Sequence, residues 1–361
     1  MEKSKNNLLE DSEGVALLVG YMIGVDILSI GNSLTNIAKQ DAWIAVAIGG
    51  IYPLALSFLS WYYVKKHPSE DILTLSKKYL GKVLGTICNI LFMAQFAIYF
   101  LGSSSGLVNV YIVNATPFLT PVKLYIPIIF LCVYLNQKGI KVLARINKIA
   151  FYSTIILEFT VASALLQGNY LNLFPILGSG YKSVFHGVIE SAFAYGGIEG
   201  IFLIYPFLIN KNKIKAITLK ATFFIIGIHI WITSICIYFL GYKVSSIALW
   251  PVLLLTESVS SPVFSNFRFI FLFLWSIVVF KVVANQYYAI NYILSDTLKV
   301  KHENMLSWLI APIIFYLCLK MGSEVQRRAF LGYIIPKLTL FNIAYITIIA
   351  ILIFIKDKRG D

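Results

Sequence analysis

Two stretches decide how this chain folds: residues 20–28 read GYMIGVDIL, and residues 192–200 read AFAYGGIEG. Each lies in the middle of an apolar run and combines glycines with one carboxylate, Asp26 in the first and Glu199 in the second. A glycine inside a helix costs up to about 1 kcal/mol relative to alanine, although membrane helices also use small residues for close packing. Glycines with a carboxylate at the starts of two chain halves favour two helices that are interrupted at their centres.

The composition is that of a membrane protein. Of 361 residues, 58% are hydrophobic and only 13% are charged, whereas a soluble domain carries about 25% charged residues. This balance argues against a soluble enzyme, a disordered chain and a disulfide scaffold. About 20 apolar residues cross a bilayer as a helix, so a chain of this length has room for about ten spans.

The apolar runs predict an all-α integral membrane protein with about ten transmembrane helices. It forms a single domain, 1–361, whose halves cover about 14–166 and 185–355. The predicted spans are 14–36, 43–64, 84–106, 123–136, 145–166, 185–209, 216–240, 267–293, 305–321 and 335–355. An even number of spans places both termini on the same side. The run IALWPVLLL at 247–255 is too short to cross a bilayer, so we expect a re-entrant or interfacial segment there.

The basic residues indicate the orientation. The net charge is +13, and lysine and arginine lie mainly between the apolar runs, which fits membrane topology better than a nucleic-acid partner. With the N-terminus inside, the cytoplasmic segments hold 20 of these residues and the outer segments hold 9. We therefore expect both termini in the cytoplasm. The segment 320–337 holds four of the nine outer charges, so either this loop is basic or the last two spans are misplaced.

Five ionisable side chains fall clearly inside the predicted spans: Asp26, Glu158, Glu190, Glu199 and Lys281. A charge inside the bilayer costs roughly 2.5–3.5 kcal/mol on insertion scales, so each of the five is a candidate functional residue. Glu199 is the strongest candidate, because it lies beside a glycine pair where backbone groups lack helical partners. It could bind an ammonium group, accept a proton or cap the broken helix.

The interrupted helices define the predicted ligand site. Unwound backbone near the membrane centre offers free N–H and C=O groups, and the N-terminus of a half-helix attracts a carboxylate. The predicted ligand-binding residues are Gly24, Val25, Asp26, Tyr195, Gly196, Gly197 and Glu199. Asn285 lies one turn from Lys281 on a helix face that we expect to point inward. His186 and Glu190 share a face near the outer membrane surface, where we expect them to face water rather than to gate entry.

Several short features follow one another along the chain: IGVDIL at 23–28, DAW at 41–43, YGGIE at 195–199 ahead of Pro206, Trp275, and YYA at 287–289. In this order and spacing they resemble the B subunit of bacterial spore germinant receptors, within the amino acid–polyamine–cation transporter superfamily. The resemblance covers essentially the whole chain. It implies ten helices in a five-plus-five inverted repeat, with a ligand pocket at the breaks of helices one and six. It also implies a complex with A and C subunits in the spore inner membrane that senses small germinants such as amino acids.

One residue departs from the family pattern. Where this chain has Asp26, the family usually has a second small residue, often glycine. A carboxylate there could repel the carboxylate of an amino acid, or it could hold an ammonium group, a cation or Lys281. In the resembled fold, spans one, five and eight pack around a cation site. We therefore expect Asp26, Glu158, Lys281 and Asn285 to form an ion or charge network, or else a salt bridge that fixes helix packing.

These observations favour a receptor subunit that binds a small germinant and signals to partner subunits. The alternative is a proton- or cation-coupled amino acid transporter that uses the same pocket, and a third possibility is a structural scaffold. No GxSxG, HExxH, P-loop or GxGxxG stands in a suitable context, and the four cysteines lack metal-site spacing. We expect neither enzymatic activity nor a cofactor or metal. The expected partners are the lipid bilayer, the two receptor subunits and the germinant, with no nucleic acid.

Overall fold

The computed structural model describes residues 7–258, 267–300 and 302–359. Within these ranges the regular elements are α-helices and short 3-10 helices, and one isolated β-bridge joins Leu9 to Leu208. Three residues used for the predicted orientation, Lys3, Lys5 and Lys301, lie outside the described ranges. The all-α architecture predicted from the sequence is confirmed.

The first half of the chain forms helices that correspond to predicted spans one to five. They are α1 (Asp11–Met22), α2 (Ile30–Ala38), α3 (Ala42–Gly49), α4 (Ile51–Lys66), α5 (Ile72–Leu80), α6 (Lys82–Asn114), α7 (Pro121–Gln137) and α8 (Ile140–Ala162). The two pieces α1 and α2 make up span one, and α3 with α4 make up span two. Spans three, four and five are α6, α7 and α8, while the short helix α5 connects spans two and three.

The second half repeats this pattern with a broken helix at its start. Its helices are α9 (Tyr181–Ala194), α10 (Ile201–Ile204), α11 (Ile214–Ile247), α12 (Pro251–Ser258), α13 (Phe267–Leu298), α14 (Glu303–Lys320) and α15 (Glu324–Arg359). Span six consists of α9 and α10, and spans seven to ten are α11, α13, α14 and α15. The proline-containing run 247–255 ends α11 and forms most of the short helix α12.

The predicted boundary of span ten is wrong. The last helix begins at Glu324, eleven residues before the predicted start at 335, so only 321–323 connect it to α14. The apolar run at 329–335 continues the helix toward its N-terminus, and Pro336 is accommodated inside it. Glu324 forms ion pairs with the arginines one turn later, which lets a charged first turn remain helical. The basic residues at 327, 328 and 337 therefore lie on a helix, not in an outer loop.

The chain is an integral membrane protein. In the part of the chain that the structure describes, seven helical stretches are long and apolar enough to cross a bilayer. They are Ile30–Lys66, Lys82–Asn114, Ile140–Leu166, Lys211–Ile247, Arg268–Leu298, Glu303–Lys320 and Glu324–Lys356. Two further apolar stretches, Pro121–Gln137 and Ile198–Phe207, are shorter. Large apolar side chains such as Phe159, Phe273 and Leu340 are exposed on the bundle surface, where a bilayer would cover them.

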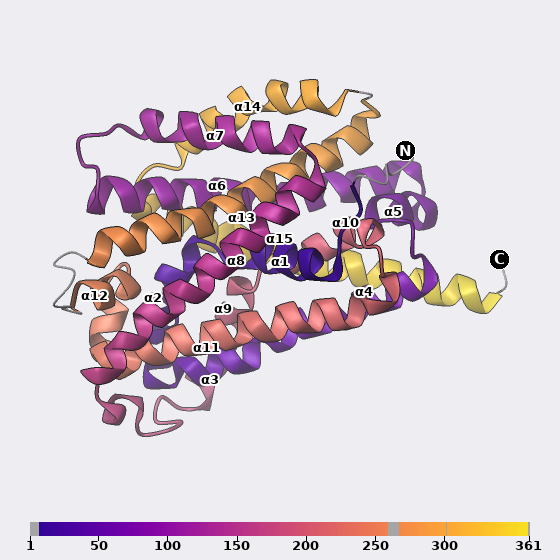
Figure 1. The fold of residues 1–361 in the computed structure, drawn as a ribbon. Coiled ribbons are helices and arrows are strands. Elements are labelled where there is room, and N and C mark those ends of the chain that lie inside the picture. Colours follow the sequence, from indigo (N-terminus) through magenta and orange to yellow (C-terminus); the bar gives the residue numbers. More distant parts are fainter. Residues whose placement is uncertain (1–6, 259–266, 301, 360–361) are drawn as a thin grey trace.

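The broken helices lie at the centre of the bundle (Figure 1). The first half-helix, α1, packs against α8, α11 and α13, and the second, α2, packs against α9 and α11. The long helix α13 runs beside α6 and α8. Figure 1 shows the chain beginning and ending on the same side of the bundle, while α12 lies at the opposite end.

Candidate ligand-binding site

The first broken helix is interrupted over seven residues. The last residue of α1 is Met22, and Ile23 and Gly24 then adopt extended backbone angles. A single 3-10 turn, Val25–Leu28, leads to the start of α2 at Ile30. The interruption predicted from the glycines is confirmed, and it leaves backbone groups of this segment without α-helical partners.

The second broken helix depends on one glycine. The last residue of α9 is Ala194, and Gly197 adopts a left-handed conformation with φ of 105° before the 3-10 turn Ile198–Gly200. A Cβ atom on Gly197 would lie 2.2 Å from the carbonyl oxygen of Tyr21 in α1. Only glycine fits this position, because both the backbone angle and the close approach of α1 exclude a side chain.

The two interruptions pack directly against each other. Gly197 approaches the main chain of Tyr21, and the Tyr21 ring covers Gly200, whose Cβ would lie 3.1 Å from it. The side-chain amide of Gln286 in α13 donates to the same Tyr21 carbonyl at 3.5 Å. The breaks of spans one and six, which are far apart in the sequence, thus form one central region.

Glu199 is fully enclosed by donors at this region. Its side chain is 1% exposed. One carboxylate oxygen accepts hydrogen bonds from the Tyr52 hydroxyl at 2.5 Å and from the Gln95 amide at 2.8 Å. The other accepts from the backbone N–H of Gly197 at 2.7 Å, which satisfies one backbone donor at the break. Gln95 in turn accepts a hydrogen bond from Asn342 of α15, so Gln95 connects Glu199 at the second break to the last helix.

Tyr195 points away from the break. Its hydroxyl donates to the backbone oxygen of Val46 in α3 at 2.8 Å, and its ring lies 4.9 Å from that of His229 in α11. The side chain is completely buried. Of the predicted ligand-binding residues, Tyr195 and Glu199 therefore hold the helices around the breaks together.

Asp26 has the opposite environment. It is exposed to a cavity of about 410 Å³ that lies between α2, α9 and α15, on the side of the breaks away from the chain termini. The residues that line it are Asp26, Ser29, Ile30, Ser33, Leu34, Asn36, Ile37, Glu190, Ala194, Arg327, Arg328, Leu331, Gly332, Ile335 and Pro336. Glu190, predicted only to face water, is part of this wall. The cavity thus carries two carboxylates and two guanidinium groups.

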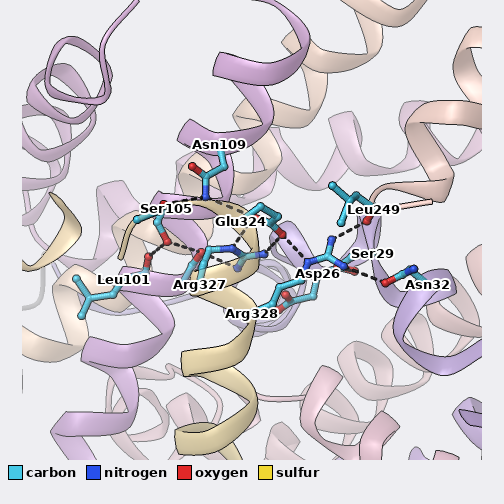
Figure 2. Close-up of polar contacts among 12 residues, drawn as sticks. Asp26, Ser29, Asn32, Leu101, Ser105, Asn109, Leu249, Glu324, Arg327 and Arg328 are labelled. Atoms are coloured by element: carbon cyan, nitrogen blue, oxygen red, sulfur yellow. Dashed lines mark hydrogen bonds and ion pairs between the residues drawn. The ribbon is translucent and has the colours of Figure 1, made fainter. Parts of the chain in front are cut away.

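The arginines belong to a charged cluster at the start of α15 (Figure 2). Glu324 accepts from Arg327 at 2.7 and 2.8 Å and from Arg328 at 2.6 Å. The Arg327 side chain is 2% exposed, and its third bond goes to the backbone oxygen of Gly102 in α6 at 3.0 Å. Arg328 is 24% exposed.

Arg328 ties three parts of the chain together around the cavity. Besides Glu324, it donates to the side-chain oxygen of Asn32 in α2 at 3.0 Å and to the backbone oxygen of Leu249, just before α12, at 2.6 Å. Figure 2 shows Asp26 lying beside this guanidinium group. The sequence interpretation placed both arginines in an outer loop and missed them as site residues. The apolar run directly after them, 329–335, was the signal that they begin a helix.

The predicted charge network is only partly assembled. Lys281 donates to the Thr154 hydroxyl of α8 at 3.1 Å. Glu158 lies one turn after Thr154, and both residues line a small internal cavity. One carboxylate oxygen of Glu158 is buried and has no hydrogen-bond partner among the described residues. Ile27 lines this cavity too, whereas Asp26 lies with the arginines of α15.

The expected meeting of Asp26 with Lys281 is therefore wrong. Among the described residues, Lys281 forms no ion pair. The physical reason is the 3-10 turn at the break, in which successive side chains diverge by a third of a turn. This turn directs Ile27 toward α8 and Asp26 toward α15.

Asn285 forms a separate polar contact. Its amide exchanges two hydrogen bonds with the amide of Asn147 in α8, at 2.8 and 2.9 Å. Both Asn285 and Lys281 are completely buried, as expected for an inward face. Gly20 of α1 lies against this pair, because a Cβ there would come within 1.7 Å of the Asn147 oxygen. The pair therefore fixes the packing of α1, α8 and α13.

Two solved structures share the fold of this chain. A crystal structure of MhsT in complex with L-phenylalanine superposes with a TM-score of 0.67 over 94% of this chain and 87% of MhsT, at 13% identity. A Na⁺-coupled sialic acid symporter in a substrate-bound outward-open state gives a TM-score of 0.60 over 93% of this chain and 76% of its own, at 11% identity. The fold is thus the five-plus-five inverted repeat of transporters with broken helices one and six.

Sequence relatives identify the family within this fold class. A family model described as spore germination protein matches residues 8–326, and the chain belongs to that family. Spore germination protein YndE of Bacillus subtilis (strain 168) is 23% identical over 99% of both chains. Spore germination protein GerQB of Bacillus cereus is 22% identical over 81% of each chain.

Proposed function

We propose that this chain is the membrane subunit of a spore germinant receptor and that it binds an amino acid in the cavity between α2, α9 and α15. The observation that carries the proposal is the pair of opposite charges in that cavity. Asp26 is exposed to it from the first break, and Arg328 lines it from α15. A zwitterionic amino acid presents an ammonium group and a carboxylate, which match these two side chains.

Arg328 retains binding capacity for a ligand. A guanidinium group has five N–H donors, and the hydrogen bonds of Arg328 to Glu324, Asn32 and Leu249 use one donor each. The remaining donors on a partly exposed side chain are available to a carboxylate. On the other side of the cavity, Asp26 and Glu190 offer carboxylates to the ammonium group of an amino acid.

The same arginine suggests how binding leads to a signal. A ligand shifts a conformational equilibrium only through its different affinity for the two states. A carboxylate that competes for Arg328 would weaken its bonds to Asn32 and Leu249, which hold α2 and the segment before α12 against α15. We infer that the released segments pass the change to the A and C subunits. The proposal assigns the chain no catalytic step and no cofactor.

Membership of the spore germination protein family and the distribution of basic residues support the location. We propose that the subunit lies in the spore inner membrane with both termini in the cytoplasm. Purification of the chain from spores should then recover A and C subunits together with it. Recovery of the chain alone under conditions that keep membrane complexes intact would contradict the receptor assignment.

Direct binding tests the site. Purified wild type is titrated with the common L-amino acids, and the best ligand is then compared with its N-acetyl form and with its carboxamide. We expect Asp26→Asn to lower affinity at least about tenfold, equivalent to about 1.4 kcal/mol, while Glu70→Gln, a surface carboxylate at the far end, keeps wild-type affinity. Equal affinity of wild type and Asp26→Asn would overturn the proposed site.

A proton- or cation-coupled amino acid transporter remains the second candidate, because the chain shares its fold with a Na⁺-coupled symporter. Uptake of the labelled amino acid into proteoliposomes separates the two functions. A receptor subunit binds the amino acid without concentrating it. Concentrative uptake by this chain alone, driven by a proton or sodium gradient, would replace the receptor assignment with the transporter.

A further inference from the structure

A second cavity lies at the end of the bundle that carries the chain termini. It has a volume of about 650 Å³ and opens between the first turns of α1, the middle of α8 and the first turns of α11. We call this cavity the basic groove. It is separate from the site of Asp26, with which it shares no residue.

The rim of the basic groove is positively charged. Lys148 donates to the Ser12 hydroxyl at 3.1 Å, and Lys213 pairs with Asp11 at 2.8 Å. The hydrogen bond from Lys213 holds the pKa of Asp11 below its ordinary value, so that Asp11 is ionised. Lys220 is exposed and forms no hydrogen bond or ion pair with any described residue. Three ammonium groups thus face one carboxylate, which leaves a net positive rim.

The wall below the rim is apolar. Val15 and Ala16 come from α1, Phe151 from α8, and Ala216 and Ile217 from α11. Tyr152 is 58% exposed on the same stretch of α8 and borders the groove on its lipid-facing side. The groove thus has ammonium groups at the membrane surface and apolar side chains below them. A phospholipid has its phosphate at the surface and its acyl chains below, so the two arrangements are complementary.

We propose that an anionic phospholipid of the surrounding membrane occupies the basic groove, with its phosphate on Lys148 and Lys220 and an acyl chain along Phe151 and Ile217. Basic pockets between transmembrane helices on the cytoplasmic side select anionic headgroups. The distribution of lysine and arginine places this end of the bundle in the cytoplasm.

The lipid would act on the half-helix that precedes the first break. The start of α1 is held to α8 through Ser12 and Lys148 and to α11 through Asp11 and Lys213. A phosphate that also bridges Lys148 and Lys220 adds a contact between α8 and α11 across the groove. Anionic lipid therefore stabilises the packing of α1 against α8 and α11 that the structure shows.

The test compares two lysines on the same helix. Lys220 lines the groove and forms no hydrogen bond or ion pair with any described residue, whereas Lys215 lies over the rings of Phe58 and Trp61, at 5.7 and 5.3 Å, outside the groove. The full chain in detergent is titrated with phosphatidylglycerol or phosphatidylcholine, and bound lipid is counted by native mass spectrometry. Lys220→Gln and Lys215→Gln have equal net charge, so a difference between them reports the position and not the total charge.

We expect wild type to bind phosphatidylglycerol more tightly than phosphatidylcholine. Each lysine near an anionic lipid contributes about fivefold to affinity, so Lys220→Gln should weaken phosphatidylglycerol binding about fivefold and Lys148→Gln with Lys220→Gln about 25-fold. Lys215→Gln should leave it unchanged. If the double variant fails to fold, because Lys148 also binds Ser12, the single Lys220→Gln variant still decides the question.

Several results would overturn the proposal. Equal losses in Lys215→Gln and Lys220→Gln would show a general charge effect. Displacement of phosphatidylglycerol by millimolar inorganic phosphate alone would show a site for a free anion. Unchanged lipid binding in Lys220→Gln, together with loss of a co-purifying protein, would assign the groove to a protein partner instead.

Discussion

The two broken helices carry carboxylates at matching places, and the structure uses them in opposite ways. Glu199 at the second break is buried and accepts hydrogen bonds from Tyr52, Gln95 and the backbone of Gly197. Asp26 at the first break is exposed to a cavity beside Arg328. A carboxylate that already has its donors stabilises the fold, and one without them remains available for a ligand. This difference supports the proposal that the ligand binds at the first break and that the second break is structural.

The largest expected effect is on the supporting side. Glu199→Leu leaves three buried donors without an acceptor, and each such group costs about 1–3 kcal/mol, so we expect stability to fall by about 4 kcal/mol. The measurement is thermal unfolding of the purified protein, with Asp26→Leu as the matched carboxylate removal at the other break. A larger loss in Asp26→Leu than in Glu199→Leu would reverse the assignment of the two breaks.

The second largest effect on stability is expected at Gly197 in the second break. Gly197→Ala puts a Cβ 2.2 Å from the Tyr21 oxygen at a φ of 105°, and we expect a loss of about 2–3 kcal/mol from strain and overpacking. Gly227→Ala in α11 is the control, since a Cβ there meets no atom within 4 Å and adds helix propensity. Unfolding curves that shift equally for the two variants would refute the requirement for glycine at 197.

Substitution of Arg328 should have a smaller effect on stability and a selective effect on ligand binding. Arg328→Gln loses bonds to Glu324, Asn32 and Leu249, which together we expect to contribute about 1–2 kcal/mol. It should weaken binding of the amino acid much more than binding of its carboxamide, which lacks the carboxylate. Equal weakening for both ligands, measured by titration calorimetry, would mean that Arg328 does not contact the carboxylate.

The smallest effect is expected at Lys281. Among the described residues, the ammonium group of Lys281 donates a hydrogen bond only to the Thr154 hydroxyl. Replacing a buried charge with an apolar side chain of similar size is often neutral or stabilising. We therefore expect Lys281→Met to leave the stability unchanged or to raise it by about 1 kcal/mol. Amino acid affinity should not change, because Asp26 lies with α15. A loss of affinity in Lys281→Met, with normal unfolding, would restore the predicted link between Asp26 and Lys281.

The sequence was sufficient for the fold because the signals for it are local. Apolar runs located the ten spans, and the glycines at 20–24 and 196–197 located both breaks. The start of α15 was missed because charge was weighted above the apolar run that follows it. Ion pairs with Glu324 offset the cost of placing Arg327 and Arg328 in a membrane helix. These pairs cannot be recognised before the residues are assigned to the same helix.

The site was harder to predict because it depends on which way side chains turn at an irregular segment. Helical periodicity does not apply across residues 23–29, so the opposite directions of Asp26 and Ile27 could not be derived from spacing. Glu199 was predicted from the sequence to be the strongest candidate for ligand binding, but its three donors come from α4, α6 and the break itself. Long-range partners of this kind decide whether a buried carboxylate is structural or available.

The most direct test is a cryo-electron microscopy map of the receptor with the saturating amino acid that binds best in titration. We predict ligand density in the cavity between α2, α9 and α15, with its ammonium end at Asp26 and its carboxylate end at Arg328. Density that contacts Glu199 or Tyr195 and leaves Asp26 and Arg328 without a ligand would contradict this account.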